Sequence, residues 1–326
     1  MNIAILGAGA WGTAVALSSW RAHHTVTLIT KNAQDAAEIN THHENITFFP
    51  GIEIPEAITV THHYDGLKTC DVLFLVCPSA AIDDVGKHIQ EAGLPASVPI
   101  ISFCKGLPGE TWELPSMYIS RRFPSNPFGV LSGPSYAREV ALGLPTTVVL
   151  ASKNPDCRNL AFQFPNMTIL PSEDVIGVEL GGCLKNIYAI GAGIFDGLQL
   201  GTNAKCSYMM TCLQEMIMIG QKLGAQTETF YGPSGIGDFL ATCSGSWSRN
   251  RTFGESLIQD YDPHKLFTQS VAAIEGYRSV KTFHRIFEEK SIPAPVVNAL
   301  YQILYGGTIQ DVADIKTTIL AAVFPS

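Results

Sequence analysis

Residues 2–21 read NIAILGAGAWGTAVALSSWR and contain the feature that decides the fold. The apolar run Asn2–Leu6 has the composition of a buried strand, and residues 13–21 continue as a helix. Between them, Gly7-Ala8-Gly9-Ala10-Trp11-Gly12 has the spacing G-x-G-x-x-G. There the first glycine permits a tight turn, the second lets backbone approach a pyrophosphate, and the third lets helix and strand pack closely. The same spacing occurs in purely structural turns, but its place between a strand and a helix favours dinucleotide binding.

Working outward, the first half of the chain alternates short apolar, β-branched runs with helical or polar segments. The predicted strands are Asn2–Leu6, Val26–Thr30, Thr59–Thr61, Val72–Cys77, Ile100–Cys104, Gly129–Leu131, Thr147–Ala151 and Thr168–Leu170. The predicted helices are Trp11–Arg21, Ile82–Glu91, Glu113–Arg122 and Tyr136–Leu142. This order requires right-handed crossovers and a largely parallel sheet covered on both faces. The sequence therefore predicts an α/β chain with a Rossmann-like, doubly wound, mostly parallel sheet.

The second half of the chain has a different pattern. Beyond about Asp174, apolar residues recur at helical spacing, and similar patterns cover Tyr208–Leu223 and Ser270–Glu288. We therefore expect two domains joined by a short junction at Pro171–Asp174. The first would be a dinucleotide-binding domain over residues 1–175, and the second an all-α substrate-binding and catalytic domain over residues 176–326.

The composition excludes several classes of protein. A 326-residue chain with 46% hydrophobic and 15% charged residues is a packed globular protein. Its 21 Lys and Arg against 29 Asp and Glu leave a net charge of −8, which lacks the basic excess of a nucleic-acid binder. A few local cations are still enough to bind a small anionic substrate.

Cysteine, histidine and hydropathy patterns indicate the compartment and argue against metals. The eight cysteines form no C-x-x-C and the histidine doublets no H-E-x-x-H, so we expect no metal site and a reducing, cytoplasmic location. The most apolar segment is interrupted by Lys185, Asn186 and Asp196, so we expect no membrane span.

The end of the second predicted strand bears on cofactor choice. It reads Thr30-Lys31-Asn32, without the Asp or Glu that would bind the ribose hydroxyls of NAD. Lys31 can instead meet a ribose 2′-phosphate, so we expect NADPH to be accepted, and the sequence leaves the preference between NADP and NAD open. The alternative is a solvated loop lysine with no ligand.

Two clusters in the second half suggest proton-transfer chemistry. Lys185 lies among small and apolar neighbours in Gly181–Asn186, where a lysine drawn out of water can act as a general acid or base. Snorkelling along a helix face is the alternative, which the helix glycines weaken because they suggest close approach by backbone or ligand. Asp238 would either orient Lys185 or cap the following helix, and Thr242 would share its helix face.

Other segments offer groups for an anion. Ser248-Arg249-Asn250-Arg251 places two arginines, an amide and a hydroxyl at a predicted helix start, which is a plausible phosphate clamp, although exposed arginines are often only solvated. Lys105, and the turn containing Gly133 and Ser135, follow predicted strands. Ligands of doubly wound sheets collect at those carboxyl ends.

Together these blocks resemble the bacterial NAD(P)-dependent glycerol-3-phosphate dehydrogenases. The resemblance rests on GAGAWGTA (7–14), CKG (104–106), LSGPSYAREV (131–140), LKN (184–186), GIGDFLATC (235–243) and SRNR (248–251). It covers nearly the whole chain in the expected order. It implies reversible reduction of dihydroxyacetone phosphate to sn-glycerol 3-phosphate with NADP or NAD, supplying glycerol 3-phosphate for phospholipid synthesis.

The resemblance also implies roles for individual residues. Lys185 is similar to the family's proton donor and acceptor, with Asp238 and Lys105 as its catalytic companions. The residues assigned to the cofactor are Gly7, Gly9, Ala10, Trp11, Gly12, Lys31, Lys105, Ala137, Arg249 and Glu275. The residues assigned to the substrate are Lys105, Gly133, Ser135, Lys185, Asn186, Asp238, Thr242, Ser248, Arg249 and Asn250.

Two other functions fit parts of the pattern. A related β-hydroxyacid dehydrogenase would also combine a Rossmann turn with a helical lysine-asparagine site, but its substrate would carry a carboxylate. A non-catalytic NAD(P)-sensing module would need no proton donor, so Lys185 with Asp238 argues against it. The apolar helical half also allows a homodimer.

Overall fold

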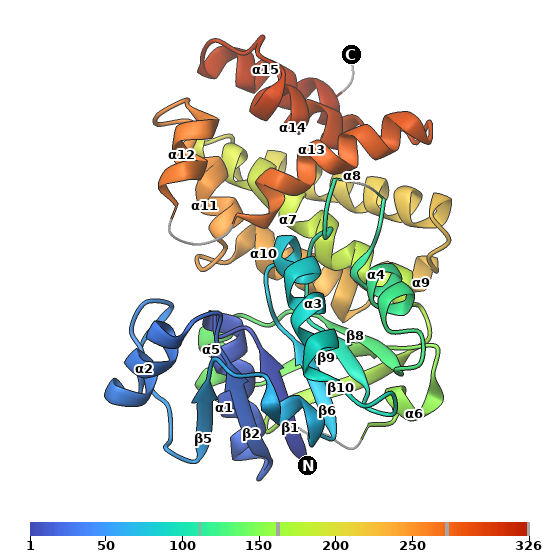
Figure 1. Cartoon of the computed structure of the whole chain (residues 1–326). Coiled ribbons are helices and arrows are strands. Elements are labelled where there is room, and N and C mark those ends of the chain that lie inside the picture. The colour runs from blue at the N-terminus through green and yellow to red at the C-terminus, as the bar shows by residue number, and fades with distance from the viewer. Residues whose placement is uncertain (111, 161–163, 271–273, 325–326) are drawn as a thin grey trace. The chain divides into compact units, whose positions relative to one another are not determined.

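The computed structural model describes residues 1–110, 112–160, 164–270 and 274–324. The chain forms two compact units. The first contains Met1–Gly109 and Glu113–Val175, and the second contains Glu110–Trp112 and Ile176–Ser326. In Figure 1 the first unit runs from blue to yellow-green, and the second continues through yellow and orange to red.

The first unit is built on an eight-stranded sheet with the order β10-β9-β8-β7-β6-β1-β2-β5. Its strands are β1 (Asn2–Leu6), β2 (Thr25–Ile29), β5 (Ile58–Thr61), β6 (Val72–Leu75), β7 (Ile100–Ser102), β8 (Phe128–Ser132), β9 (Thr146–Ala151) and β10 (Met167–Ser172). All neighbouring strands run parallel except β8 and β9. A short antiparallel ribbon, β3 (Glu44–Asn45) and β4 (Phe49–Glu53), stands apart from this sheet. The predicted mostly parallel sheet is confirmed.

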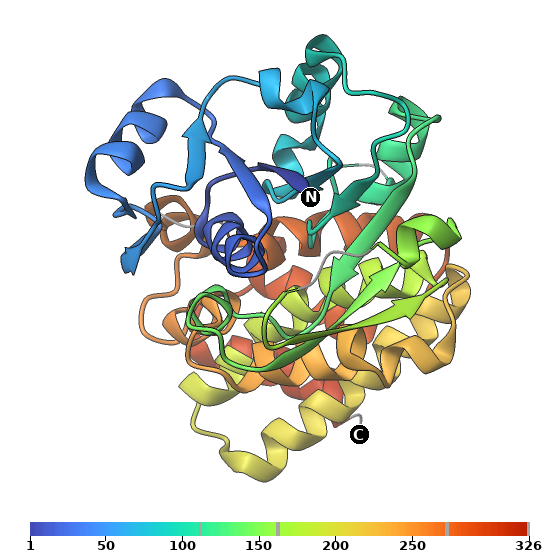
Figure 2. The ribbon, with the colours of Figure 1, turned by 90° about the horizontal axis from the view of Figure 1, so that it is seen from below.

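Helices cover both faces of this sheet (Figures 1 and 2). They are α1 (Ala10–Arg21), α2 (Ala33–His42), α3 (Ile82–Ala92), α4 (Pro115–Arg122), α5 (Ala137–Ala141) and α6 (Pro155–Arg158), with the 3₁₀ turns η1 (Asp65–Lys68) and η2 (Ser79–Ala81). Along β1, Ile3 and Ile5 join one core cluster with α1 and α5, whereas Ala4 and Leu6 join the other with α3 and α4. Alternate side chains of one strand are thus buried on opposite faces, as a doubly wound sheet requires.

The second unit is helical in its described residues. It contains α7 (Val175–Gly197), α8 (Gly201–Lys222), α9 (Thr227–Phe230), a π-type turn η3 (Pro233–Gly237), α10 (Asp238–Ser244), α11 (Arg249–Ser256), α12 (Pro263–Gln269), α13 (Glu275–Glu289), α14 (Pro295–Tyr305) and α15 (Val312–Val323). By length and composition α7 is apolar enough to cross a membrane, but 94% of its most apolar window is buried inside the protein. Its apolar surface is therefore used in packing, as the core of this unit.

A buried carboxylate ties three helices of the second unit together. Glu215 on α8 accepts hydrogen bonds from the backbone N–H groups of Val296 (2.7 Å) and Val297 (3.1 Å), at the start of α14. It also accepts one from the hydroxyl of Tyr188 on α7 (3.1 Å). No side chain of α14 or its flanking residues caps this helix start, so Glu215 satisfies the unpaired N–H groups from another helix. This contact holds the middle of α7, three residues beyond Lys185.

Several sequence-based boundaries are wrong. Pro171 and Ser172 do not form a junction, because they pair with β9 as the end of β10. The helix expected over Tyr208–Leu223 begins earlier, at Gly201. Its first turns were missed because they face solvent and show no apolar periodicity. The helix expected over Ser270–Glu288 is α13, which begins at Glu275. Residues 271–273 of the expected range lie outside the described residues.

The helix α2 was not predicted from the sequence, and it buries only Ala36 and Ile39. A helix with so little apolar surface carries no clear period, so its sequence does not reveal it.

Candidate active site

The turn between β1 and α1 is shaped by its three glycines. Gly7 has a φ of +116°, and a Cβ there would lie 2.7 Å from the carbonyl oxygen of Val76. A Cβ on Gly12 would lie 1.7 Å from the carbonyl oxygen of Gly7, so only glycine lets the helix sit against the turn. A Cβ on Gly9 would meet nothing within 4 Å, so this side of the turn is open. No side chain caps the start of α1, which leaves its N–H groups and positive dipole end suited to an anion.

One residue that supports this turn was missed from the sequence. Asn45 is buried, and its amide donates to the carbonyl oxygen of Ala8 (2.8 Å) and to the hydroxyl of Thr13 (2.9 Å). It thereby joins the turn to the first part of α1. Asn45 lies in a polar stretch without periodicity, and no local signal marks it.

Apart from Lys105, the other residues assigned to the cofactor in this unit are Ala10, Trp11, Lys31 and Ala137. Trp11 packs against Phe103 with ring centroids 6.2 Å apart, and Ala10 and Ala137 pack against the same core cluster. Lys31 is exposed just after β2, at the residue before Asn32, which caps α2.

Lys105, Gly133 and Ser135 are brought together by neighbouring strands of the sheet. Lys105 follows β7 and donates from Nζ to the carbonyl oxygen of Gly133 (3.0 Å) and to Oγ of Ser135 (3.5 Å), both of which follow β8. Ser135 Oγ also donates to the Gly133 carbonyl (2.9 Å). Gly133 has a φ of +151°, and a Cβ there would lie 2.8 Å from Cα of Val148. The strand ends therefore collect an ammonium, a hydroxyl and a backbone turn.

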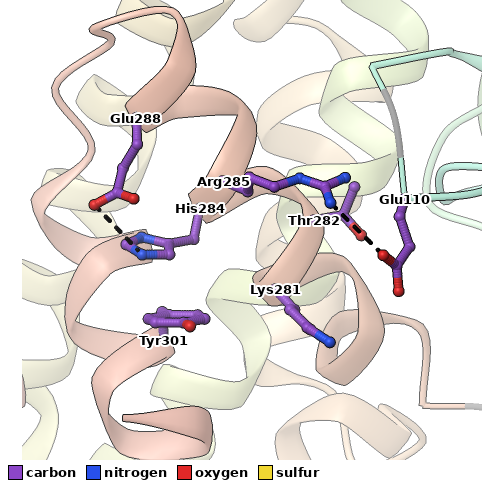
Figure 3. Close-up of a pocket in the computed structure, with 7 residues that line it drawn as sticks. All are labelled: Glu110, Lys281, Thr282, His284, Arg285, Glu288 and Tyr301. Atoms are coloured by element: carbon purple, nitrogen blue, oxygen red, sulfur yellow. Dashed lines mark ion pairs between the residues drawn. The ribbon is translucent and has the colours of Figure 1, made fainter.

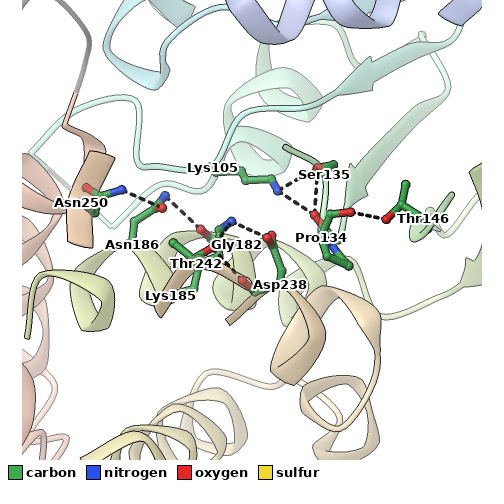
Figure 4. Close-up of polar contacts among 11 residues, drawn as sticks. Lys105, Pro134, Ser135, Thr146, Gly182, Lys185, Asn186, Asp238, Thr242 and Asn250 are labelled. Carbon is green, nitrogen blue, oxygen red and sulfur yellow. Dashed lines mark hydrogen bonds and ion pairs between the residues drawn. The ribbon is translucent and has the colours of Figure 1, made fainter. Parts of the chain in front are cut away.

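In the second unit, Lys185 is buried against Asp238 and Thr242 (Figure 4). Its ammonium forms a buried ion pair with Oδ1 of Asp238 and donates to Oγ1 of Thr242 at 2.9 Å. Thr242 Oγ1 in turn donates to the carbonyl oxygen of Asp238 (2.6 Å), one turn earlier in α10. Of the two possibilities for Asp238, the structure shows the first, because its carboxylate bonds the lysine.

A glycine of α7 explains how α10 reaches Lys185. A Cβ on Gly181 would lie 2.4 Å from the carbonyl oxygen of Ser234, in η3. Gly181 lies one helical turn before Lys185, so the backbone of η3 can touch α7 there and deliver Asp238 beside the ammonium. The close backbone approach expected from the helix glycines is present.

Asn186 and Asn250 form a second polar cluster (Figure 4). Asn250 Nδ2 donates to Oδ1 of Asn186 (3.0 Å), and Asn186 Nδ2 donates to the carbonyl oxygen of Gly182 (3.3 Å). The backbone N–H of Gly276 donates to Oδ1 of Asn250 (3.0 Å). A Cβ on Gly276 would lie 2.3 Å from the carbonyl oxygen of Asn186, so this glycine lets α13 approach α7. Gly276 follows Glu275 and was not singled out from the sequence.

The SRNR segment divides into residues with different tasks. Desolvation lowers the pKa of Arg249, and the charge of Glu275 opposes that effect, so these two assigned residues are electrostatically coupled. Ser248 is the N-cap of α11, where its Oγ accepts from the backbone N–H of Arg251 (3.3 Å). The guanidinium of Arg251 donates to Asp196 (2.7 Å). Of the two arginines expected to form the clamp, Arg251 is thus bonded to a carboxylate of its own unit.

The second unit also contains a cavity of about 190 Å³ between α13, α14 and Glu110 (Figure 3). None of the assigned residues lines it. His284 stacks on Tyr301 with ring centroids 3.7 Å apart, and Arg285 pairs with Glu110 at 3.6 Å. These contacts are made among the lining residues themselves, so we assign the cavity no role.

A Rossmann-like sheet with a glycine-rich turn, followed by a helical region that buries a lysine against an aspartate, defines a two-domain NAD(P)-dependent dehydrogenase. Residues 2–158 match the family model of the NAD-dependent glycerol-3-phosphate dehydrogenase N-terminus, and residues 174–314 match that of its C-terminus. The chain belongs to the NAD-dependent glycerol-3-phosphate dehydrogenase family. The resemblance stated from the sequence is therefore confirmed.

Individual relatives agree with this assignment. Glycerol-3-phosphate dehydrogenase [NAD(P)+] of Herminiimonas arsenicoxydans is 38% identical over 317 residues, covering 95% of each chain. The protein of the same name from Halalkalibacterium halodurans is 36% identical and covers 94% of this chain and 90% of its own. The crystal structure of glycerol-3-phosphate dehydrogenase from Coxiella burnetii superposes with a TM-score of 0.90 at 32% identity, covering 98% of this chain and 97% of that one.

Proposed function

We propose that this protein reversibly reduces dihydroxyacetone phosphate to sn-glycerol 3-phosphate with NADPH or NADH, and that the product supplies phospholipid synthesis. The observation that carries the proposal is the buried ammonium of Lys185, bonded to Asp238 and Thr242, in a chain of this family. A binding module would need no proton donor, and taking a lysine out of water is costly even when it is paired.

The turn at Gly7–Gly12 fits a nicotinamide dinucleotide. Its open side at Gly9 and the uncapped start of α1 suit a pyrophosphate. When bound, the reduced cofactor supplies a hydride to the carbonyl carbon of the substrate. We assign this binding to the first unit and the substrate chemistry to the second, as expected for residues 1–175 and 176–326.

The protein's own groups complete the reaction. As the carbonyl carbon gains a hydride, its oxygen becomes an alkoxide, and Lys185 stabilises this charge and then donates a proton from Nζ. Asp238 accepts a hydrogen bond from the same Nζ and so orients it, as does Thr242. In the oxidative direction the neutral amine of Lys185 removes the hydroxyl proton. Lys105 adds positive charge near the strand ends, where Gly133 and Ser135 hold it.

The phosphate end of the substrate is assigned to Arg249, Asn250 and Asn186. A guanidinium offers two parallel donors to phosphate oxygens, and the start of α11 adds N–H groups. Holding the phosphate fixes the distance and angle at which the carbonyl meets the proton donor. Ser248 contributes by capping α11, which fixes the turn that carries Arg249 and Asn250.

One assay tests the proposal. Oxidation of NADPH and of NADH is followed with dihydroxyacetone phosphate and, as a control substrate, a β-keto acid. We expect turnover only with the phosphorylated ketone, and Lys185→Ala should lower kcat by roughly 10²–10⁴ while circular dichroism shows a folded protein. Near-normal turnover by Lys185→Ala would remove Lys185 from the mechanism. Turnover with the β-keto acid alone would replace the substrate assignment, and no turnover with either would favour a sensing module.

We also propose a cytoplasmic homodimer. All eight cysteines are free thiols, which suits a reducing compartment. The second unit exposes Met210, Tyr231, Leu240 and Trp247, which a second copy could cover. A particle mass in solution of one 35.2 kDa chain instead of two would reject the dimer.

A further inference from the structure

Asp196, near the end of α7, pairs with two cationic side chains, Lys205 and Arg251. Its carboxylate accepts hydrogen bonds from Nζ of Lys205 at 2.7 Å to each oxygen, and from Nη1 of Arg251 at 2.7 Å. All three side chains are largely shielded from solvent, with exposed fractions of 26% for Asp196, 18% for Lys205 and 16% for Arg251. Charge-assisted bonds in such surroundings are strong and hold the groups in one geometry.

Arg251 is anchored in other directions as well. It donates to Oε2 of Glu255 (3.2 Å) and to the carbonyl oxygen of Gly245 (3.3 Å). Its guanidinium therefore bridges α7, α11 and the segment before α11. Arg251 lies in the same first turn of α11 as Arg249 and Asn250, to which we assign the substrate phosphate.

The backbones of α7 and α11 touch at two glycines. A Cβ on Gly193 would lie 1.8 Å from the carbonyl oxygen of Arg251, and one on Gly254 would lie 1.9 Å from the carbonyl oxygen of Ile190. Contacts of this kind set how closely the helices approach.

Two side-chain contacts add to these backbone contacts in fixing how α11 is turned about its own axis. Asn250 bonds Asn186, whereas Arg251 bonds Asp196, ten residues further along α7. At 1.5 Å per residue, these two points on α7 are about 15 Å apart. Adjacent residues of α11 therefore reach in opposite directions along α7, which fixes the orientation of this turn.

We propose that Asp196 is a positioning residue for substrate binding: through Arg251 it sets the orientation of the first turn of α11 and so directs Arg249 and Asn250 toward the substrate phosphate. The inference rests on the proposed function and deepens it. It divides the two arginines of SRNR, because Arg249 binds the ligand and Arg251 anchors the turn that presents it.

The test compares Asp196→Asn and Arg251→Met with Lys205→Met. The first two break the link to α11, whereas the third removes the other cation beside Asp196 and keeps that link. Asp196→Asn and Arg251→Met should each raise KM for dihydroxyacetone phosphate, and the inhibition constant of inorganic phosphate, by roughly tenfold, with kcat within about threefold of the unmodified enzyme. Lys205→Met should leave both constants within about threefold. The double variant Asp196→Asn/Arg251→Met should be no worse than either single one.

Three outcomes would overturn the inference: an unchanged KM in Asp196→Asn, an equal rise in KM with Lys205→Met, or a fall in kcat with no change in KM. Arg251→Lys keeps a cation facing Asp196 and should restore much of the phosphate affinity, which keeps the test decisive should Arg251→Met fold poorly. If the unmodified protein does not turn over dihydroxyacetone phosphate, the proposed function fails separately. Calorimetric binding of inorganic phosphate to the unmodified protein and to Asp196→Asn then still decides the role of Asp196.

Discussion

Glu215 should make folding stability depend on pH in a direction unusual for a carboxylate. Its side chain is buried, and burial raises the pKa of Glu215 from 4.5 to about 7. The hydrogen bonds from Val296, Val297 and Tyr188 act in the opposite sense, because they favour the ionised form, but they are the smaller effect.

The sign follows from which state holds the proton. Between pH 4.5 and about 7, the folded protein keeps a proton on Glu215 that the unfolded chain has released. Raising the pH through this interval therefore lowers the free energy of unfolding by about 1.4 kcal/mol per pH unit, on the order of 3 kcal/mol in all. Below the interval both states are protonated, and above it both are ionised, so the contribution is constant.

Glu215→Gln isolates this contribution, because glutamine stays neutral at every pH. Urea unfolding of the variant and of the unmodified protein is compared at about pH 5.5 and about pH 8. From the lower to the higher pH, the free energy of unfolding of Glu215→Gln should rise by about 2 kcal/mol relative to that of the unmodified protein. Glu228→Gln, at an exposed position on α9, is the matched control and should show no such change. A difference that stays flat, or that moves in favour of the unmodified protein, would show that the amide and hydroxyl bonds outweigh desolvation.

Two further predictions concern the cofactor. Gly12→Ala should lower the free energy of unfolding by about 1–3 kcal/mol, because its Cβ would overlap the carbonyl oxygen of Gly7. Gly9→Ala should leave the free energy of unfolding unchanged. It should weaken cofactor binding, because its methyl group would occupy the open side of the turn. Calorimetric cofactor titration and urea unfolding measure both effects, and equal stability losses in the two variants would contradict this distinction. Lys31→Glu should lower kcat/KM for NADPH relative to NADH by roughly tenfold, since it would set a carboxylate against the 2′-phosphate; an unchanged ratio would make Lys31 a solvated loop residue.

Much of the candidate site could be predicted as separate pieces. Gly7, Gly9 and Gly12 were identified because their spacing is short and the turn they form depends on local sterics. Lys185 was identified by its small and apolar neighbours within the same helix. Asp196 gave no such signal, because its partners lie on other helices.

The amino-acid order alone determined the alternation of strands and helices in the first half, the helical second half and the glycine turn, because backbone conformation and apolar periodicity depend on residues a few positions apart. Only the tertiary structure decided that the Asp238 carboxylate bonds Lys185, that Asn45 supports the glycine turn, and that Arg251 bonds Asp196. These contacts join residues tens of positions apart, and they depend on how closely backbones pack at Gly181, Gly193 and Gly254. Side-chain partners of that kind are selected by the path of the whole chain, which no local pattern encodes.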